Sequence, residues 1–360
     1  MKITFVTSGF GLSGGTKAIF EFTNHLVDMG HEVNILCSLT PFWLEGKWIN
    51  KGRLFIRFVR IFKKSKGCKA CVNWFNVKAN LKPIWSYKEK YIPDADIIVA
   101  TWWETAYFVK RYGAKKGKKF YLIQDHEIWM GNDDAVNKTY QIGLKNIVNS
   151  RWLKKTLKEK AETSVEEVIL HAPDHHQFYP ERSSKKHKNI RILMPYRRER
   201  RKGTLEGLLV LKRVKKIHPN IEIILFGQKI PKDDFGMLEK DVRFYQSPVK
   251  DELRQLYNAC DIFLYPPLEE GFGMPPMEAM ACRLPVITTS AGAIPEYTIA
   301  GKTALVSSPG NIDTMTKNLL RLIEKPKERD RIAEMGYRYI QKFRWEDAAN
   351  KLEQVFKKYI

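Results

Sequence analysis

The segment EEGFGMPPMEAMA, residues 269–281, directly follows an apolar run that ends at Tyr265. It places two glutamates, Glu270 and Glu278, around a Gly-x-Gly turn and two prolines. Glycines let the backbone approach a ligand closely, and prolines fit the first turn of a helix, which does not need their missing N–H groups. The free amides of such a helix start bind phosphate, and a neighbouring carboxylate can accept hydrogen bonds from a ribose diol. The segment therefore predicts a nucleotide-binding strand–turn–helix unit, with Glu278 in the first turn of the helix.

Apolar runs and helical periods alternate in the same way on both sides of this segment. The N-terminal half opens with a run over residues 2–6, a loop with four glycines and a helical period over residues 18–29. Further strands are predicted over residues 96–101, 120–123, 145–148, 168–170, 190–194, 221–226, 242–244, 262–265 and 286–288, and helices over residues 204–217, 251–259 and 276–282. Such alternation is typical of parallel sheets with helices on both faces. The predicted fold class is α/β, with two doubly wound, Rossmann-like domains.

A polar stretch with two prolines and no periodicity interrupts the alternation between residues 171 and 189. We therefore predict an N-terminal Rossmann-like domain over residues 1–172, a linker over 173–189, a C-terminal Rossmann-like domain over 190–340, and a final helix over 341–360 that crosses back to the first domain. Four histidines in the polar stretch, His171, His175, His176 and His187, are expected to be solvated. Open α/β sheets bind ligands at the carboxyl ends of their strands, so we expect the two domains to face each other across a cleft.

The charge of the chain is unevenly distributed. Among 360 residues, 62 Lys and Arg outnumber 40 Asp and Glu, which gives a net charge of +22. Residues 51–90 hold twelve of these cations and one acid, so one ninth of the chain carries half of the net charge. Apolar and basic side chains are interleaved over residues 54–64, with Trp74, Phe75 and Trp85 further on, as in segments that bind anionic bilayers. A partly buried element with solvated lysines is the alternative.

Several classes of protein are disfavoured. No apolar stretch reaches the roughly 20 residues of a membrane-spanning helix, and the N-terminus resembles a strand more than a signal peptide. Five cysteines form no disulfide framework, which favours the cytosol, and Cys68 and Cys71 have the spacing of only half a zinc site. No nucleic-acid-binding signature and no Gly-x-Ser-x-Gly elbow is present, so neither nucleic acid binding nor a serine hydrolase is expected.

The stretch EGFGMPPMEAMACRLPVITT, with Glu270 and Glu278 eight positions apart, resembles the retaining glycosyltransferases of family four, which have the GT-B fold. The likeness extends through SAGAIPEYTIAGKTALV (residues 290–306) and includes the early GGTKAIFEFTNHLVDMGHEV (residues 14–33), but it is weak over residues 41–95. The resemblance implies a nucleoside diphosphate-sugar donor, a glycan or lipid-linked acceptor, retention of anomeric configuration and no metal or other cofactor. A cytoplasmic enzyme, peripheral to the inner face of the membrane through residues 51–90, is the expectation.

The resemblance also implies roles for individual residues. Arg197 and Lys202, the latter followed by Gly203, have the spacing of the family's diphosphate-binding pair, although Arg198 and Arg201 offer other registers. Glu270 is implied to lie near the donor sugar hydroxyls and Glu278 to bind the ribose. The remaining implied donor contacts are backbone groups of Gly14, Gly15, Gly271, Phe272, Gly273 and Met274.

The catalytic group of the first domain is left open. The family usually places a histidine at the end of an N-terminal-domain strand, which points to His126, with Asp125 and Glu127 as rivals. A subgroup that resembles bacterial rhamnosyltransferases carries Gln-Asp-x-Glu there, as in Gln124–Glu127. A GT-B nucleotide-sugar epimerase, a nucleic-acid-binding protein and a non-catalytic glycan-binding protein are the alternative functions.

Overall fold

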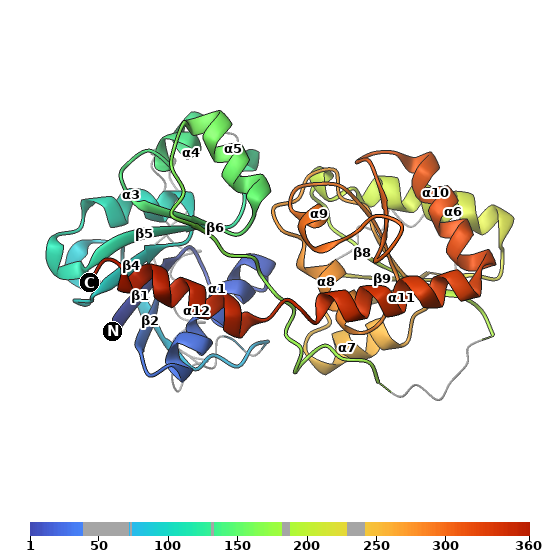
Figure 1. Ribbon diagram of the computed structural model, residues 1–360, viewed down its shortest axis with the longest axis horizontal. Helices are drawn as coiled ribbons and strands as arrows, with labels where there is room; N and C mark the ends of the chain where they lie inside the picture. Colours follow the sequence, from blue (N-terminus) through green and yellow to red (C-terminus); the bar gives the residue numbers. More distant parts are fainter. Residues whose placement is uncertain (39–71, 73, 131–132, 182–187, 229–241) are drawn as a thin grey trace, which may run out of the picture. The chain divides into compact units, whose positions relative to one another are not determined.

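The computed structural model describes residues 1–38, 72, 74–130, 133–181, 188–228 and 242–360. The chain divides into two compact units: unit 1 comprises Met1–His171 and Trp345–Ile360, and unit 2 comprises Ala172–Arg344. Each unit is a parallel sheet covered by helices (Figure 1), so the predicted fold class of two doubly wound α/β domains is confirmed. The predicted amphipathic run over residues 54–64 and the cysteines at 68 and 71 lie outside the described residues.

Unit 1 is built on a seven-stranded sheet in the order β3-β2-β1-β4-β5-β6-β7, and every neighbouring pair is parallel. Its strands are β1 (Lys2–Thr7), β2 (Glu32–Ser38), β3 (Asn80–Ile84), β4 (Ile97–Ala100), β5 (Lys118–Ile123), β6 (Lys145–Val148) and β7 (Glu167–Val168). Its α-helices are α1 (Gly14–Asp28), α3 (Trp103–Arg111), α4 (Asp133–Thr139), α5 (Arg151–Ala161) and α12 (Trp345–Lys357).

The apolar runs of unit 1 form its central strands because helices cover both faces of the sheet, so side chains on both faces need to be apolar. Ile3 in β1 pairs with Val33 in β2 and Ile97 in β4, and all three side chains are buried. The edge strand β3 was not predicted. Its sequence NLKPI carries a proline, Pro83, and proline is tolerated at a sheet edge because a ladder hydrogen bond is not required there.

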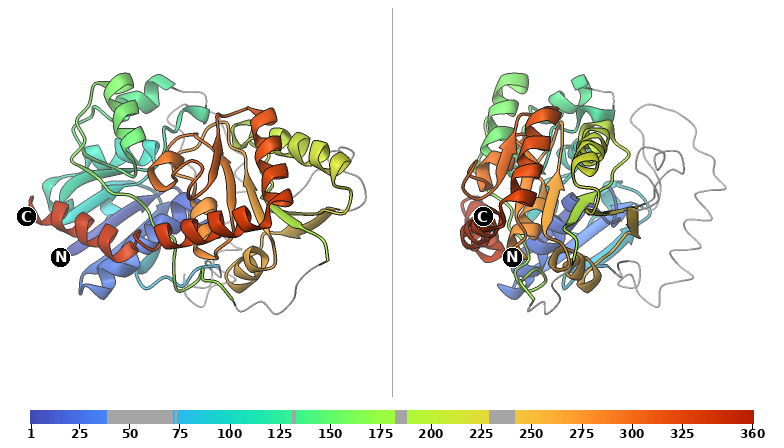
Figure 2. Two further views of the ribbon diagram at one scale, coloured as in Figure 1. Left: turned by 45° about the vertical axis from the view of Figure 1, so that its right-hand side comes forward. Right: turned by 90° about the vertical axis from the view of Figure 1, so that its right-hand side faces the viewer.

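The end of the chain belongs to unit 1. Helix α12 packs beside α1, where the rings of Phe22 and Trp345 meet edge to face at 5.1 Å, and Phe356 lies 4.9 Å from Phe120 of β5. Both chain termini therefore lie on unit 1 (Figure 2). The expectation for His171 was wrong, because this residue is buried between Phe22 and Trp345 rather than solvated. Burial lowers the pKa of His171 to about 3, so its ring is neutral at physiological pH.

Unit 2 is built on a six-stranded parallel sheet in the order β10-β9-β8-β11-β12-β13. Its strands are β8 (Arg191–Pro195), β9 (Glu222–Gly227), β10 (Val242–Gln246), β11 (Ile262–Tyr265), β12 (Val286–Thr289) and β13 (Leu305–Ser307). Its α-helices are α6 (Thr204–Ile217), α7 (Asp251–Asn258), α8 (Met274–Ala281), α9 (Ile294–Tyr297), α10 (Ile312–Glu324) and α11 (Pro326–Ile340).

Each sheet has a point at which the chain reverses its direction of travel across the strands. In unit 2 the chain leaves β8 for β9 and β10, then returns to place β11 on the other side of β8. In unit 1 it leaves β1 for β2 and β3, then places β4 on the other side of β1. The loops after the two central strands diverge there, and open α/β sheets bind ligands in the resulting crevice. The fold thus directs attention to the loops after β8 and β11.

Aromatic side chains after the basic stretch were predicted to reach an interface. Trp74 and Phe75 are half-buried and contact Phe20 of α1, with ring centroids 5.5 Å from it, and the Trp74 indole donates to the carbonyl of Phe10. These two residues therefore belong to the packing of unit 1. Trp85 is 52% exposed. Within the described residues, no helix combines the length and the apolar character needed to cross a bilayer.

Candidate functional site

The loops that follow β8 and β11 in unit 2 are joined by backbone contacts. The carbonyl of Arg201, in the short 3-10 helix after β8, accepts hydrogen bonds from the amides of Leu268 (2.8 Å) and Glu269 (2.9 Å). Gly203 makes this approach feasible, because a Cβ atom there would lie 1.7 Å from the carbonyl oxygen of Pro266. Its φ of +66° is also a conformation that other residues adopt at a cost. The glycine after Lys202 therefore allows the basic loop to pack against the acidic one.

Lys202 and Glu270 form an ion pair across the two loops. Lys202 Nζ lies 2.8 Å from Glu270 Oε1, and the Tyr265 hydroxyl donates to the other carboxylate oxygen. The side chains are only 17% and 8% exposed, respectively. Burial by itself would raise the pKa of Glu270, but the charge and hydrogen bond of Lys202 outweigh it and hold this pKa below its ordinary value. The site therefore holds a charged carboxylate in a nearly dry position.

Glu278 is the second buried acid of the site. It lies on α8, and the hydroxyl of Tyr257 donates to its Oε2 at 3.1 Å. Because α8 begins at Met274, Glu278 occupies the second turn rather than the predicted first turn. The earlier start follows from Gly273, whose left-handed conformation caps the helix and brings both prolines into its first turn.

Arg197 acts on the two tyrosines that donate to these acids. Its guanidinium donates to the carbonyl of Tyr196 at 3.2 Å, and its charge opposes the large burial-driven rise in the pKa of the Tyr257 and Tyr265 hydroxyls. The Tyr257 hydroxyl donates a hydrogen bond to Glu278, and the Tyr265 hydroxyl donates one to Glu270. Arg197 and Arg201 are half-buried, whereas Arg198 is exposed, so exposure distinguishes Arg197 only from Arg198.

The turn between the two acids supplies backbone groups. Gly271, Phe272, Gly273 and Met274 are all buried, and the hydroxyl of Tyr297 donates to the carbonyl of Gly273 at 2.6 Å. The first turn of α8 carries no acidic side chain. Its amides retain the partial positive charge of a helix N-terminus, which suits an anionic group.

The candidates of unit 1 lie at the carboxyl edge of its own sheet. Gly14 and Gly15 begin α1, whose N-cap Ser13 accepts a hydrogen bond from the amide of Thr16. A Cβ atom on Gly15 would lie 3.5 Å from the side-chain amide of Gln124, which follows β5. The glycine loop and the end of β5 therefore adjoin each other within this unit.

The three candidate catalytic residues after β5, Asp125, His126 and Glu127, have different surroundings. The amide of Trp103 donates to Glu127 Oε2 at 2.9 Å, and burial raises the pKa of Glu127 well above its ordinary range. Glu127 therefore caps the start of α3 from inside the unit. His126 Nε2 lies 2.9 Å from Asn137 Oδ1, and Asp125 accepts a hydrogen bond from the amide of His126. Asp125 and His126 are half-buried and remain the candidates of this edge for contact with substrate.

The structure thus brings together Arg197, Lys202, Glu270, Glu278 and the turn 271–274 in unit 2, and the other predicted residues in unit 1. Two hydroxyls of this site, on Tyr257 and Tyr265, were not predicted. The position of Tyr265 at the end of a strand, five residues before Glu270, could have indicated its contact with Glu270. The contact of Tyr257 with Glu278 could not have been predicted in this way, because it depends on helix packing. Among the described residues, no group of three or more His, Cys, Asp or Glu side chains converges as metal ligands do.

Comparison with known proteins finds a family and several relatives that are similar to part of this chain. Residues 176–339 match the family described as Glycosyl transferases group 1. Curated relatives include an O-antigen chain mannosyltransferase B of Escherichia coli, 28% identical over 38% of this chain and 37% of its own length. An MMP alpha-(1->4)-mannosyltransferase of Mycolicibacterium hassiacum is 34% identical over 31% of this chain and 27% of its own length. The matches thus span about a third of these relatives.

Solved structures extend the likeness of the fold to the whole chain. Anabaena HepE, solved in complex with UDP, superposes with a TM-score of 0.76 over 99% of this chain and 100% of its own, at 16% identity. The neighbours by structure are glycosyltransferases with the GT-B fold. The unit 2 residues of the candidate site fall within the matched residues 176–339. This chain therefore has the GT-B fold, and residues 176–339 of its unit 2 are similar to the Glycosyl transferases group 1 family.

Proposed function

We propose that this protein transfers a sugar from a nucleoside diphosphate-sugar to an acceptor hydroxyl in glycan or glycolipid synthesis, with retention of anomeric configuration and without a metal ion. The observation that carries the proposal is the buried Lys202–Glu270 pair, placed at the strand reversal of unit 2 beside Arg197 and the start of α8. The names of the relatives support glycosyl transfer, and UDP in the HepE complex makes UDP-sugars the first donors to test.

The chemistry follows from the charges at this site. As the bond between the anomeric carbon and the diphosphate breaks, negative charge grows on the leaving oxygen. Arg197, Lys202 and the first-turn amides of α8 supply fixed positive charge there, so they stabilise the transition state more than the ground state. The buried carboxylate of Glu270 accepts hydrogen bonds from sugar hydroxyls, and Glu278 accepts them from the ribose. We propose that the departing phosphate oxygen accepts the acceptor's proton on the same face, which retains the configuration.

The experiment measures nucleoside diphosphate release and sugar transfer from UDP-glucose, GDP-mannose, ADP-glucose and dTDP-rhamnose, with a panel of hydroxyl acceptors. Replacing Lys202 with alanine should lower turnover roughly 100- to 1,000-fold, as removal of one preorganised positive donor does. The matched control is K116A in unit 1, which removes an ion pair of the same 2.8 Å length, between Lys116 and Asp94, away from every predicted site residue. K116A should keep wild-type turnover.

Each part of the proposal has its own contrary outcome. If no donor is bound or turned over, or if K202A is as active as K116A, glycosyl transfer at this site is wrong. A donor sugar that changes configuration without reaching an acceptor indicates an epimerase. Proton NMR of the new glycosidic linkage reads the anomeric outcome, and inversion would contradict retention. Loss of turnover in EDTA would contradict metal independence.

Association with an anionic membrane surface through residues 51–90 stays a prediction from charge. Residues 51–71 and 73 lie outside the described part of the chain, and the described remainder contains Trp74 and Phe75, which are half-buried against Phe20 of α1. The identity of the acceptor follows from assays with glycan and lipid-linked hydroxyls rather than from this segment.

A further inference from the structure

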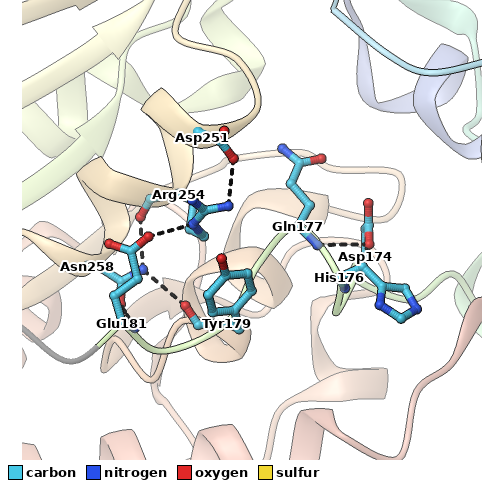
Figure 3. A network of polar contacts seen from close by, with 8 residues as sticks. All are labelled: Asp174, His176, Gln177, Tyr179, Glu181, Asp251, Arg254 and Asn258. Carbon is cyan, nitrogen blue, oxygen red and sulfur yellow. Dashed lines mark hydrogen bonds and ion pairs between the residues drawn. The ribbon is translucent and has the colours of Figure 1, made fainter.

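Residues at the start of unit 2 are clasped to helix α7 by a polar network (Figure 3). Arg254 donates from Nε to Glu181 at 2.7 Å and from Nη1 to Asp251 at 2.6 Å, and its guanidinium lies 4.6 Å from the ring centre of Tyr179. Asn258 accepts from the amide of Glu181 and donates to the carbonyl of Tyr179. The segment over residues 179–181 is therefore joined to both ends of the last turn of α7.

Tyr257 lies in this same turn and points inward, where three rings enclose it. Phe178, which directly precedes the clasped segment, Phe226 from β9 and Phe263 from β11 meet the Tyr257 ring edge to face at 5.8, 6.2 and 5.4 Å. Tyr257 is 1% exposed. Edge-to-face packing on several sides restricts rotation of the ring, so the direction of its hydroxyl is set by the surrounding structure.

That hydroxyl is aimed at the nucleotide site. It donates to Glu278 Oε2 at 3.1 Å, and both groups are buried. A carboxylate offers about four lone-pair directions, so the hydrogen bond from Tyr257 restricts its orientation and is compatible with a ligand hydroxyl that donates to the same group. A diol that binds through two parallel hydrogen bonds requires a carboxylate held in one orientation.

We propose that Tyr257 is a positioning residue, which orients the Glu278 carboxylate for the two ribose hydroxyls of the donor and is itself held by the Glu181–Arg254 clasp. This inference rests on the proposed function, because it assigns the ribose to Glu278. It predicts that Tyr257 affects recognition of the ribose hydroxyls in particular, through Glu278, rather than nucleotide binding in general.

The test compares the dissociation constants of UDP and 2′,3′-dideoxy-UDP by titration calorimetry, on the full chain. If each ribose hydroxyl adds about tenfold, equivalent to 1.4 kcal/mol, wild type should prefer UDP by roughly 100-fold. Y257F should bind UDP about tenfold more weakly but bind dideoxy-UDP within about twofold of wild type. In an E278Q background, Y257F should have no further effect on either ligand, because its action passes through Glu278.

The matched control is Y112F in unit 1, which also removes a buried hydroxyl that donates one hydrogen bond, to the carbonyl of Tyr87 at 2.8 Å. Y112F should lower the melting temperature to a similar extent and keep the wild-type preference for UDP. R254M tests the clasp without touching Tyr257, and should reduce the preference by about threefold.

A preference for UDP that is unchanged in both Y257F and R254M would overturn the inference. So would an equal loss of UDP and dideoxy-UDP affinity in Y257F, because that indicates a general structural effect. If wild type binds UDP but does not distinguish dideoxy-UDP, the ribose assignment of Glu278 is wrong and this inference fails while glycosyl transfer stands. If wild type binds none of UDP, GDP, ADP and CDP, the proposed function fails with it.

Discussion

Removal of the Lys202 charge should destabilise unit 2 in a manner that depends on pH. In K202M the carboxylate of Glu270 keeps its burial and its hydrogen bond from Tyr265 but loses its cation. Breaking a buried ion pair by removing one partner costs about 3–5 kcal/mol, because the other charge stays buried and unpaired. The exposed pair of Lys78 and Asp28 is the comparison: its side chains are 54% and 47% exposed, and such pairs contribute about 0–1 kcal/mol. K78M should therefore be nearly neutral.

The sign of the pH dependence follows from the pKa of Glu270. In wild type this pKa is lowered, so the pair contributes stability above the ordinary value of 4.5 and loses it as pH falls through the folded value. In K202M the opposing charge and hydrogen bond of Lys202 are gone, so we expect burial to raise the folded pKa of Glu270 above 4.5. The variant should then lose stability as pH rises above 4.5, by up to about 1.4 kcal/mol per pH unit. At low pH the acid is protonated, and the difference from wild type should shrink.

Hydrogen exchange read by mass spectrometry on peptides from β8 and β11 reports the opening free energy of unit 2 by itself, which global unfolding of a two-unit chain does not. The double variant K202M/E270Q replaces both charges with neutral side chains of similar shape and should recover most of the loss. A loss below about 1 kcal/mol at pH 7, a flat pH profile, or no recovery in the double variant would each refute the buried pair as described.

Two further predictions concern single positions. Because burial raises the pKa of Glu127 above its ordinary 4.5, unit 1 should lose stability as pH rises above 4.5; E127Q, which can still accept from Trp103, should remove this slope in exchange measured on β4 and β5 peptides. G203A should lower the free energy of unfolding by more than about 3 kcal/mol, because it adds a collision with Pro266 to a left-handed backbone. The control is G30A, at a glycine that is also left-handed but has open space around it, and it should lower the free energy of unfolding by about 1–2 kcal/mol. Equal melting temperatures of the two variants would contradict the close approach of the loops.

Much of the fold follows from the sequence because buried parallel strands read as continuous apolar runs. The runs at Lys2–Thr7 and Ile262–Tyr265 identify central strands in this way. The reversal of strand order then brings the loops of Lys202 and Glu270 together, although 68 positions separate them. The sequence alone predicted that Lys202 and Glu270 lie in loops after strands and belong to the candidate site. The edge strand β3 was not, since an edge needs neither continuous apolarity nor all of its amides.

The environment of each acid could not be predicted from the local sequence. Glu127, Glu270 and Glu278 all follow parallel strands of similar composition. Burial raises the pKa of Glu127, Lys202 from another loop lowers that of Glu270, and Glu278 accepts from a tyrosine on another helix. His171 likewise reads as part of a polar stretch, and only the return of Trp345 to unit 1 buries it. These properties depend on long-range packing, for which short motifs carry no signal.

The pairing of Lys202 also changes what this lysine can do. In the structure its ammonium is paired with the Glu270 carboxylate, so phosphate binding is not its sole role. An ammonium has three donors, so it can keep the carboxylate and also donate to a diphosphate oxygen. Under the proposed function, one cation then joins the group that recognises the sugar to the group that stabilises the leaving diphosphate. Arg197 has no hydrogen bond to Glu270 among the contacts of the described residues, and its charge acts on the hydroxyls of Tyr257 and Tyr265 instead. Loss of Lys202 should therefore impair sugar placement and departure of the leaving group together, which a purely electrostatic role in phosphate binding does not predict.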